Sequence, residues 1–157
     1  MGVKFLLENI SKICKVVGGV MTPPYEKGRM TMILQNLHHV AIIASDYEKS
    51  KDFYVNKLGF QVIKEEFRQP QNDIKLEVKL ANATIEIFGK KDPEPNHGKP
   101  TRCGMWHLCF YAPDLEKTIA ELNALGIPTD PIMVNASNGK RICFFYDPDG
   151  LPLELHE

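Results

Sequence analysis

The chain contains an internal repeat with a spacing of 68 residues. Residues 39–50 align with residues 107–118, with identities at His39/His107, Ala44/Ala112, Asp46/Asp114, Glu48/Glu116 and Lys49/Lys117. Glu86 and Glu154 are separated by the same 68 residues, and each lies between two aliphatic residues. A repeat on this scale predicts two copies of one supersecondary unit that pack together.

Each copy has the same predicted order of elements. In the first, a β-rich run over 38–43 precedes a helix N-cap at Asp46 or Ser45. Apolar spacing continues the helix to Leu58, before Gly59. Strands are predicted over 60–68, 74–80 and 84–89. The second copy gives a strand over 105–111, a helix from Asp114 to about Leu125, and strands over 127–134, 141–146 and 151–155. The sequence therefore predicts an α+β fold of two β-α-β-β-β modules.

The 157 residues divide unevenly around this repeat. Residues 32–157 form the predicted domain, with repeat one over 37–90, a Pro-rich linker over 91–102 and repeat two over 103–157. Residues 1–31 are interpreted as an N-terminal extension that is not native, with Met32 as the natural start. Apolar residues interrupted by lysines predict a short amphipathic helix over 1–21.

The repeated histidines and glutamates indicate a metal site. Strand alternation directs Glu86 and Glu154 away from their apolar neighbours, and a carboxylate in so apolar a context is costly to bury without a cation. A lone strand histidine is usually structural and a lone strand glutamate is usually solvated, but the shared register favours convergence. We therefore expect His39, Glu86, His107 and Glu154 to bind one divalent ion: Zn²⁺, Ni²⁺, Co²⁺, Mn²⁺ or Fe²⁺. Open coordination positions would admit a small-molecule substrate.

The composition argues against nucleic-acid binding, a membrane span and a disulfide framework. A net charge of −1 with no dense Lys/Arg run gives no basic face for nucleic acid. No apolar run is long enough to span a membrane. The four cysteines form no CxxC pair, which favours free thiols and a cytoplasmic protein.

At these residues the chain resembles the vicinal oxygen chelate superfamily, and within it glyoxalase I. The resemblance runs from about Leu37 to the C-terminus and is carried by the segments 38–42, 53–60, 85–87, 107–111 and 147–154. It implies an incomplete barrel of paired βαβββ modules, the glyoxalase/bleomycin resistance/dioxygenase fold. It also implies that the quartet of His39, Glu86, His107 and Glu154 is the ligand set, and that the metal holds the oxygens of a hemithioacetal. A ligand glutamate would then move a proton between the two carbons of that substrate. Glu154 is then the first choice for the base, with Glu86 as its partner.

One position departs from the glyoxalase I pattern. Glutathione-dependent relatives usually carry an arginine four residues after the first histidine ligand, where this chain has Ile43. The resemblance therefore does not predict glutathione as the thiol. Alternatives from the same fold are an extradiol-type dioxygenase, a fosfomycin-modifying transferase and a non-enzymatic binding or resistance protein. The first two leave Glu86 unexplained, and the third lacks metal ligands. We expect a homodimer, with the site built within one chain or across two.

Overall fold

The computed structural model describes residues 15–17, 20–22, 36–95 and 104–157. The chain divides into two units, Met1–Asn36 and Leu37–Glu157. In the first unit, β1 (Lys15–Val17) and β2 (Val20–Thr22) pair as antiparallel strands. The helix predicted over 1–21 is therefore wrong for these residues, where β-branched valines favour strands. The rest of that predicted helix lies outside the described residues.

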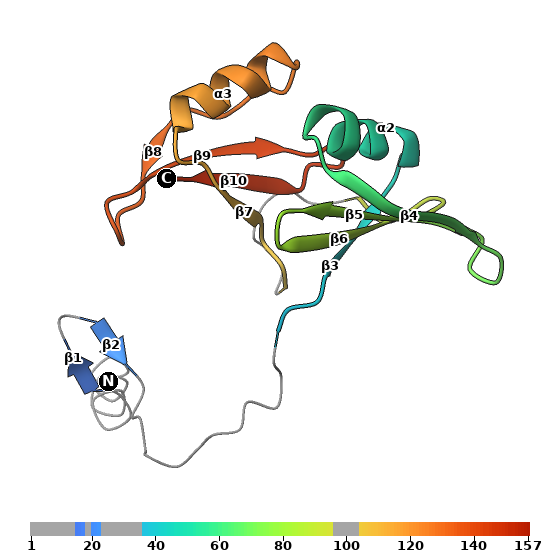
Figure 1. The fold of residues 1–157 in the computed structure, drawn as a ribbon, viewed down its shortest axis with the longest axis horizontal. Helices are drawn as coiled ribbons and strands as arrows, with labels where there is room; N and C mark the ends of the chain where they lie inside the picture. Colours follow the sequence, from blue (N-terminus) through green and yellow to red (C-terminus); the bar gives the residue numbers. More distant parts are fainter. Residues whose placement is uncertain (1–14, 18–19, 23–35, 96–103) are drawn as a thin grey trace. The chain divides into compact units, whose positions relative to one another are not determined.

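The second unit contains two modules with one topology (Figure 1). The first comprises β3 (Val40–Ala44), α2 (Tyr47–Lys51), the π-helix η1 (Asp52–Lys57), β4 (Gln61–Arg68), β5 (Asp73–Leu80) and β6 (Ala83–Gly89). The second comprises β7 (Leu108–Tyr111), α3 (Leu115–Ala124), β8 (Met133–Val134), β9 (Arg141–Tyr146) and β10 (Pro152–His156). The sheet orders are β3-β6-β5-β4 and β7-β10-β9-β8, and the first strand of each module runs parallel to its last. The predicted α+β pair of βαβββ modules is confirmed.

The ends of the helices follow the repeat. The side chains of Asp46 and Asp114 each accept a hydrogen bond from the backbone N–H three residues later, at 3.1 and 3.0 Å. Gly59 and Gly126 adopt φ values of 76° and 74°, a left-handed conformation that costs glycine little. The predicted N-caps and helix stops are confirmed in both modules.

Two predicted elements differ from the structure. The first helix continues as the π-helix η1 rather than as a regular α-helix, and its wider turn buries the adjacent rings of Phe53 and Tyr54. The strand predicted over 127–134 is reduced to β8 and one isolated bridge at Thr129. Pro128 and Pro131 explain the loss, since a proline has no N–H to donate to a strand ladder.

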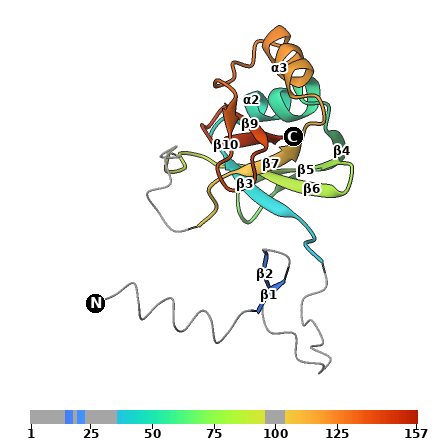
Figure 2. The ribbon, with the colours of Figure 1, turned by 90° about the vertical axis from the view of Figure 1, so that its left-hand side faces the viewer.

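The core lies between the sheets and the helices. Figures 1 and 2 show α2 and α3 on the same side of the two sheets. Ile85 and Ile87 of β6, and Leu153 and Leu155 of β10, are buried in one core cluster. Alternation along these strands therefore leaves the intervening glutamates on the opposite side of each sheet. Among the described residues, no helix is long and apolar enough to cross a membrane.

A buried hydrogen bond joins the two modules. The hydroxyl of Tyr54, which is fully buried, donates to Asp147 at 3.0 Å. Asp147 also accepts from the N–H groups of Asp149 and Leu151 at 2.9 and 2.8 Å, within the predicted turn before β10. Burial raises the pKa of the Asp147 carboxyl, and these hydrogen bonds oppose the rise. This turn therefore fixes the second module against the helix of the first.

Substitution of Tyr54 by phenylalanine tests this junction. Tyr54→Phe should lower the free energy of unfolding by about 1–3 kcal/mol, since it removes a buried hydrogen bond to a carboxylate. The matched control is Tyr47→Phe, because the Tyr47 hydroxyl donates to Glu65 at 2.6 Å near the surface. That control should cost less than about 1 kcal/mol. Urea unfolding measures both values, and equal losses would contradict a special role for the buried junction.

Candidate metal centre

His39 and Glu86 form the first predicted ligand pair. His39 directly precedes β3, Glu86 lies in mid-β6, and His39 Nε2 is 3.7 Å from Glu86 Oε2. The other ring nitrogen, Nδ1, lies 2.8 Å from Nδ1 of His38. One of these nitrogens must donate and the other accept, which orients the His39 ring and leaves its Nε2 facing the carboxylate. His38 therefore contacts the first ligand pair through the ring of His39.

Lys75 is a further charged residue at this pair. Its Nζ lies 2.6 Å from Glu86 Oε1, and the two side chains are only 20% and 13% exposed. Lys75 lies on β5, next to β6, on the face opposite the buried Leu76. Lys75 was not predicted as a site residue from the sequence. Alternation along β5 assigns its face, but only the register between the strands places it beside Glu86.

His107 and Glu154 form the second pair. His107 Nε2 lies 2.8 Å from Glu154 Oε2, and Glu154 is 6% exposed in mid-β10. Aromatic rings surround this histidine, with centroids of Trp106 and Phe144 at 5.0 and 5.6 Å. The buried Nδ1 of His107 has no hydrogen-bond partner among the described residues. Partial burial, together with the charge of Glu154, raises the pKa of the neighbouring Cys109 thiol.

The structure brings the four predicted ligands together as two separate pairs. Among the described residues, no three His, Cys, Asp or Glu side chains lie close enough together to hold one metal ion. His39 and Glu86 belong to the β3-β6-β5-β4 sheet, and His107 and Glu154 belong with the β7-β10-β9-β8 sheet. Each pair supplies one imidazole and one carboxylate.

The donor chemistry fits a divalent cation. In both pairs the histidine Nε2 faces a carboxylate oxygen, so two donor atoms are directed at one position. Within the part of the chain that the structure describes, the polar partner of the buried Glu154 carboxylate is an imidazole. An ionised carboxylate in that environment is stabilised by a nearby cation. Two imidazoles and two carboxylates suit a transition-metal dication such as Zn²⁺ or Mn²⁺.

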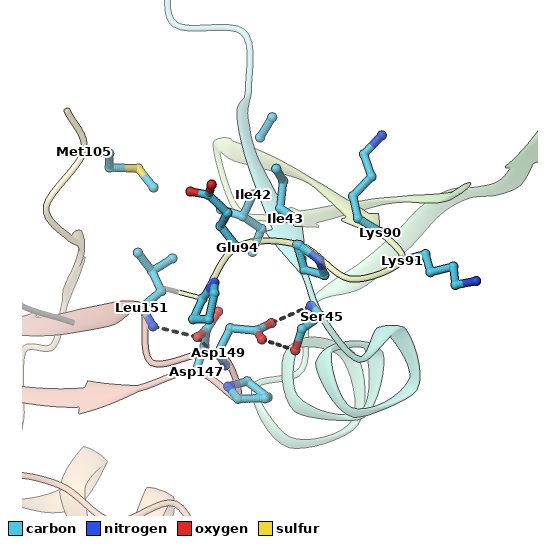
Figure 3. Close-up of a pocket in the computed structure, with 14 residues that line it drawn as sticks. Ile42, Ile43, Ser45, Lys90, Lys91, Glu94, Met105, Asp147, Asp149 and Leu151 are labelled. Carbon is cyan, nitrogen blue, oxygen red and sulfur yellow. Dashed lines mark hydrogen bonds between the residues drawn. The ribbon is translucent and has the colours of Figure 1, made fainter. Parts of the chain in front are cut away.

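A cavity of ≈950 Å³ is lined in part by β3 (Figure 3). Its walls come from β3, the segment after β6 and the turn before β10, where Ser45 donates from its backbone N–H and its hydroxyl to Asp149. None of the four predicted ligands lines it. Ala41, which lines it, is the register partner of Glu86. Ile43, which is 58% exposed, also lines the cavity. Its volume suits a small-molecule ligand.

Known proteins resemble this chain over the repeat. The uncharacterized protein YwkD of Bacillus subtilis is 49% identical over 127 residues, covering 80% of this chain and 99% of the relative. A mitochondrial methylmalonyl-CoA epimerase of Dictyostelium discoideum is 30% identical over 133 residues, covering 77% of each chain. The two relatives differ in their identity to this chain, 49% against 30%, and each name describes that relative.

Solved structures and a family profile agree with this similarity. A glyoxalase family protein from Enterococcus faecalis superposes with a TM-score of 0.76 at 48% identity, covering 80% of this chain and all 100% of the other. A lactoylglutathione lyase from Agrobacterium tumefaciens, at 20% identity and a TM-score of 0.60, covers 80% of this chain and 95% of its own and shares the fold. The Glyoxalase/Bleomycin resistance protein/Dioxygenase superfamily profile matches residues 36–155. The chain belongs to this superfamily, whose members are the vicinal oxygen chelate proteins that the sequence resembles.

Proposed function

We propose that this protein is a divalent-metal-dependent enzyme that transfers a proton at a carbon next to a carbonyl group, a lyase or isomerase of the glyoxalase I type. The observation that supports the proposal best is the repeated His–Glu pair. His39 with Glu86, and His107 with Glu154, present the same two donor types from equivalent places in two modules. A carboxylate beside a metal is suited to carbon-acid chemistry.

The residues take distinct roles in this proposal. His39, Glu86, His107 and Glu154 would hold the metal, which supplies positive charge where negative charge develops on a substrate oxygen. Glu154 is the proposed base. Its burial excludes bulk water that would compete for the proton, and His107 holds one of its oxygens at 2.8 Å. Glu86 is its proposed partner for proton return from the opposite side of the substrate.

We propose further that the quartet is completed in a homodimer, with His39 and Glu86 of one chain meeting His107 and Glu154 of a second. Each shared site of the dimer would take one His–Glu pair from each chain, which agrees with the separation of the two pairs in a single chain. Each sheet face that carries a pair also carries an exposed apolar side chain. Ile43 shares a face with Glu86 and Tyr111 shares a face with Glu154, and these side chains are 58% and 78% exposed. Exposed apolar groups of this kind favour contact with another surface.

The substrate follows less directly from the geometry. A hemithioacetal is the first candidate, but Ile43 provides no charge to bind the carboxylate of glutathione. Epimerisation of an acyl thioester is the second, and it is favoured by the 30% identity to a methylmalonyl-CoA epimerase. Both reactions use a base to move a proton next to a carbonyl, so they share one set of protein groups. An extradiol-type dioxygenase would give Glu86 no role. A non-enzymatic binding protein would give no role to any of the four ligands.

Metal analysis and Glu154→Gln test the core of the proposal. Purified protein should carry about one divalent ion per chain, measured by elemental mass spectrometry after removal of loosely bound metal. Glu154→Gln keeps the shape of the side chain but removes the base, so proton exchange at the substrate carbon should fall by about 10²–10⁴-fold. Glu121→Gln, on the surface of α3, should have no effect. Full activity in Glu154→Gln would exclude Glu154 as the base.

Mixing two defective variants tests the shared site. One variant carries His39→Ala with Glu86→Gln, and the other carries His107→Ala with Glu154→Gln. In a mixed dimer, one of the two shared sites recovers four native ligands, so about half of the mixed dimers' normal metal content should return. The control mixes two variants defective in the same pair, which should restore nothing. If the mixture of complementary variants recovers neither metal nor activity while both variants remain folded, the site is not shared between two chains.

A substrate screen separates the two candidate reactions. Methylglyoxal with several thiols reports lyase activity, and deuterium exchange into methylmalonyl-CoA reports epimerase activity, each with Ni²⁺, Zn²⁺, Co²⁺ and Mn²⁺. We expect one of the two to depend on Glu154. Exchange that occurs equally in Glu154→Gln, or in the metal-free protein, would contradict the proposal.

A further inference from the structure

A cluster of three cationic side chains lies on the same sheet face as Glu86. Arg68, Lys75 and Lys90 surround the ring of Phe88, with the Arg68 Cζ at 4.5 Å and the two lysine Nζ atoms at 5.8 and 6.0 Å from its centroid. We name Arg68, Lys75 and Lys90 the basic cluster. The register explains its position, because Lys75 is the cross-strand partner of Phe88, two residues after Glu86.

The acidic groups within the basic cluster do not balance it. The buried Asp73 accepts hydrogen bonds from Arg68 Nε and Nη2, both at 2.7 Å, and from Lys90. These partners lower the pKa of Asp73 to about 2, so it is ionised at neutral pH. Lys75 pairs with Glu86 at 2.6 Å. Within these direct contacts, three cations meet two carboxylates.

Two further carboxylates on this face, Glu66 and Glu77, lie beside another lysine, Lys64. Glu66 is the register partner of Lys75 on β4, and its own ion pair is with Lys64 at 2.5 Å. Lys75 is also only 20% exposed, so solvent screens its charge less than it screens a surface lysine. A metal ion bound to Glu86 would compete with Lys75 for the same carboxylate. Lys75 would then be free to pair with a different anion close to the metal.

We propose that Lys75, supported by Arg68 and Lys90, binds an anionic group of the substrate, a carboxylate or a phosphate, beside the metal centre. The proposal rests on the metal-dependent function proposed above and adds the substrate class to it. Arg68 and Lys90 are held by the buried Asp73, so they provide a fixed positive field, whereas Lys75 is the ammonium group that exchanges partners.

The surroundings of the basic cluster suit an organic anion. The Phe88 ring gives an apolar surface to the carbon part of a ligand, and its register partner Ile43 extends that surface on β3. Ile43 and Lys90 both line the ≈950 Å³ cavity. A small acid therefore has an apolar surface for its carbon chain and a cationic group for its charged end, connected to the cavity shown in Figure 3.

Anion titration of the full-length Zn²⁺-loaded protein tests this assignment. Isothermal calorimetry would compare succinate, inorganic phosphate and the uncharged succinamide, in wild type, Lys75→Met and Lys75→Arg. Loss of a charged hydrogen bond should weaken the preferred anion by roughly tenfold or more in Lys75→Met. Lys75→Arg keeps the charge and should retain most of the affinity. Succinamide should not bind. The tighter of the two anions identifies the group as carboxylate or phosphate.

Lys79→Met is the matched control, because Lys79 lies on the same strand and face, four residues beyond Lys75. Its anion affinity should equal that of wild type. The Zn²⁺ affinity of Lys75→Met should be equal or several-fold higher, since a competing cation at Glu86 is gone. A lysine that only positions Glu86 predicts the opposite, weaker Zn²⁺ binding with unchanged anion binding. If Lys75→Met does not fold, as judged by circular dichroism, Lys75→Gln replaces it.

Two failures remain distinguishable. Wild-type protein that binds one Zn²⁺ per chain but whose anion affinity is the same in Lys75→Met overturns the anion assignment alone. Wild-type protein that binds no Zn²⁺ at all overturns the metal-dependent function and the anion assignment together.

Discussion

A glutamate in the middle of a strand, with buried aliphatic residues on both sides, is the constraint on which this structure depends. Packing Ile85 and Ile87 against one helix layer forces Glu86 to the other face, and Leu153 and Leu155 do the same to Glu154. Neither carboxylate has the full solvation of a surface group, so each needs a positively charged or donor partner. The His–Glu pairs are the consequence in both modules.

The two copies satisfy this constraint in different ways. Glu86 faces Glu77 across the strands and has Lys75 as an ion-pair partner, in a region rich in charged side chains. Glu154 faces Phe144 across the strands and lies with His107 among aromatic rings. A site assembled from one pair of each kind would have a charged wall and an apolar wall. That asymmetry suits a reaction in which one side binds an anion and the other protects a base from water.

The sequence predicts those parts of the fold that depend on local patterns. The repeat, the N-caps at Asp46 and Asp114 and the stops at Gly59 and Gly126 need only neighbouring residues, and all are confirmed. The π-helix η1 was not predicted, because burial of Phe53 and Tyr54 together depends on the packed core. Strand alternation gives the face of Lys75 but not its distance from Glu86, and it gives no reason to expect contact between His38 and His39. The repeat and the strand alternation are enough to place His39 with Glu86 and His107 with Glu154. The separation of these residues into two pairs depends on the tertiary structure.

We propose that His39, Glu86, His107 and Glu154 together hold one metal ion. Crystals of the Zn²⁺-loaded protein, with anomalous diffraction measured on both sides of the zinc absorption edge, locate that ion directly. We expect one zinc peak per chain, bound by Nε2 of His39 and His107 and by carboxylate oxygens of Glu86 and Glu154, at about 2.0–2.2 Å. Zinc bound elsewhere, or bound by only one His–Glu pair with the other pair remote, would contradict it.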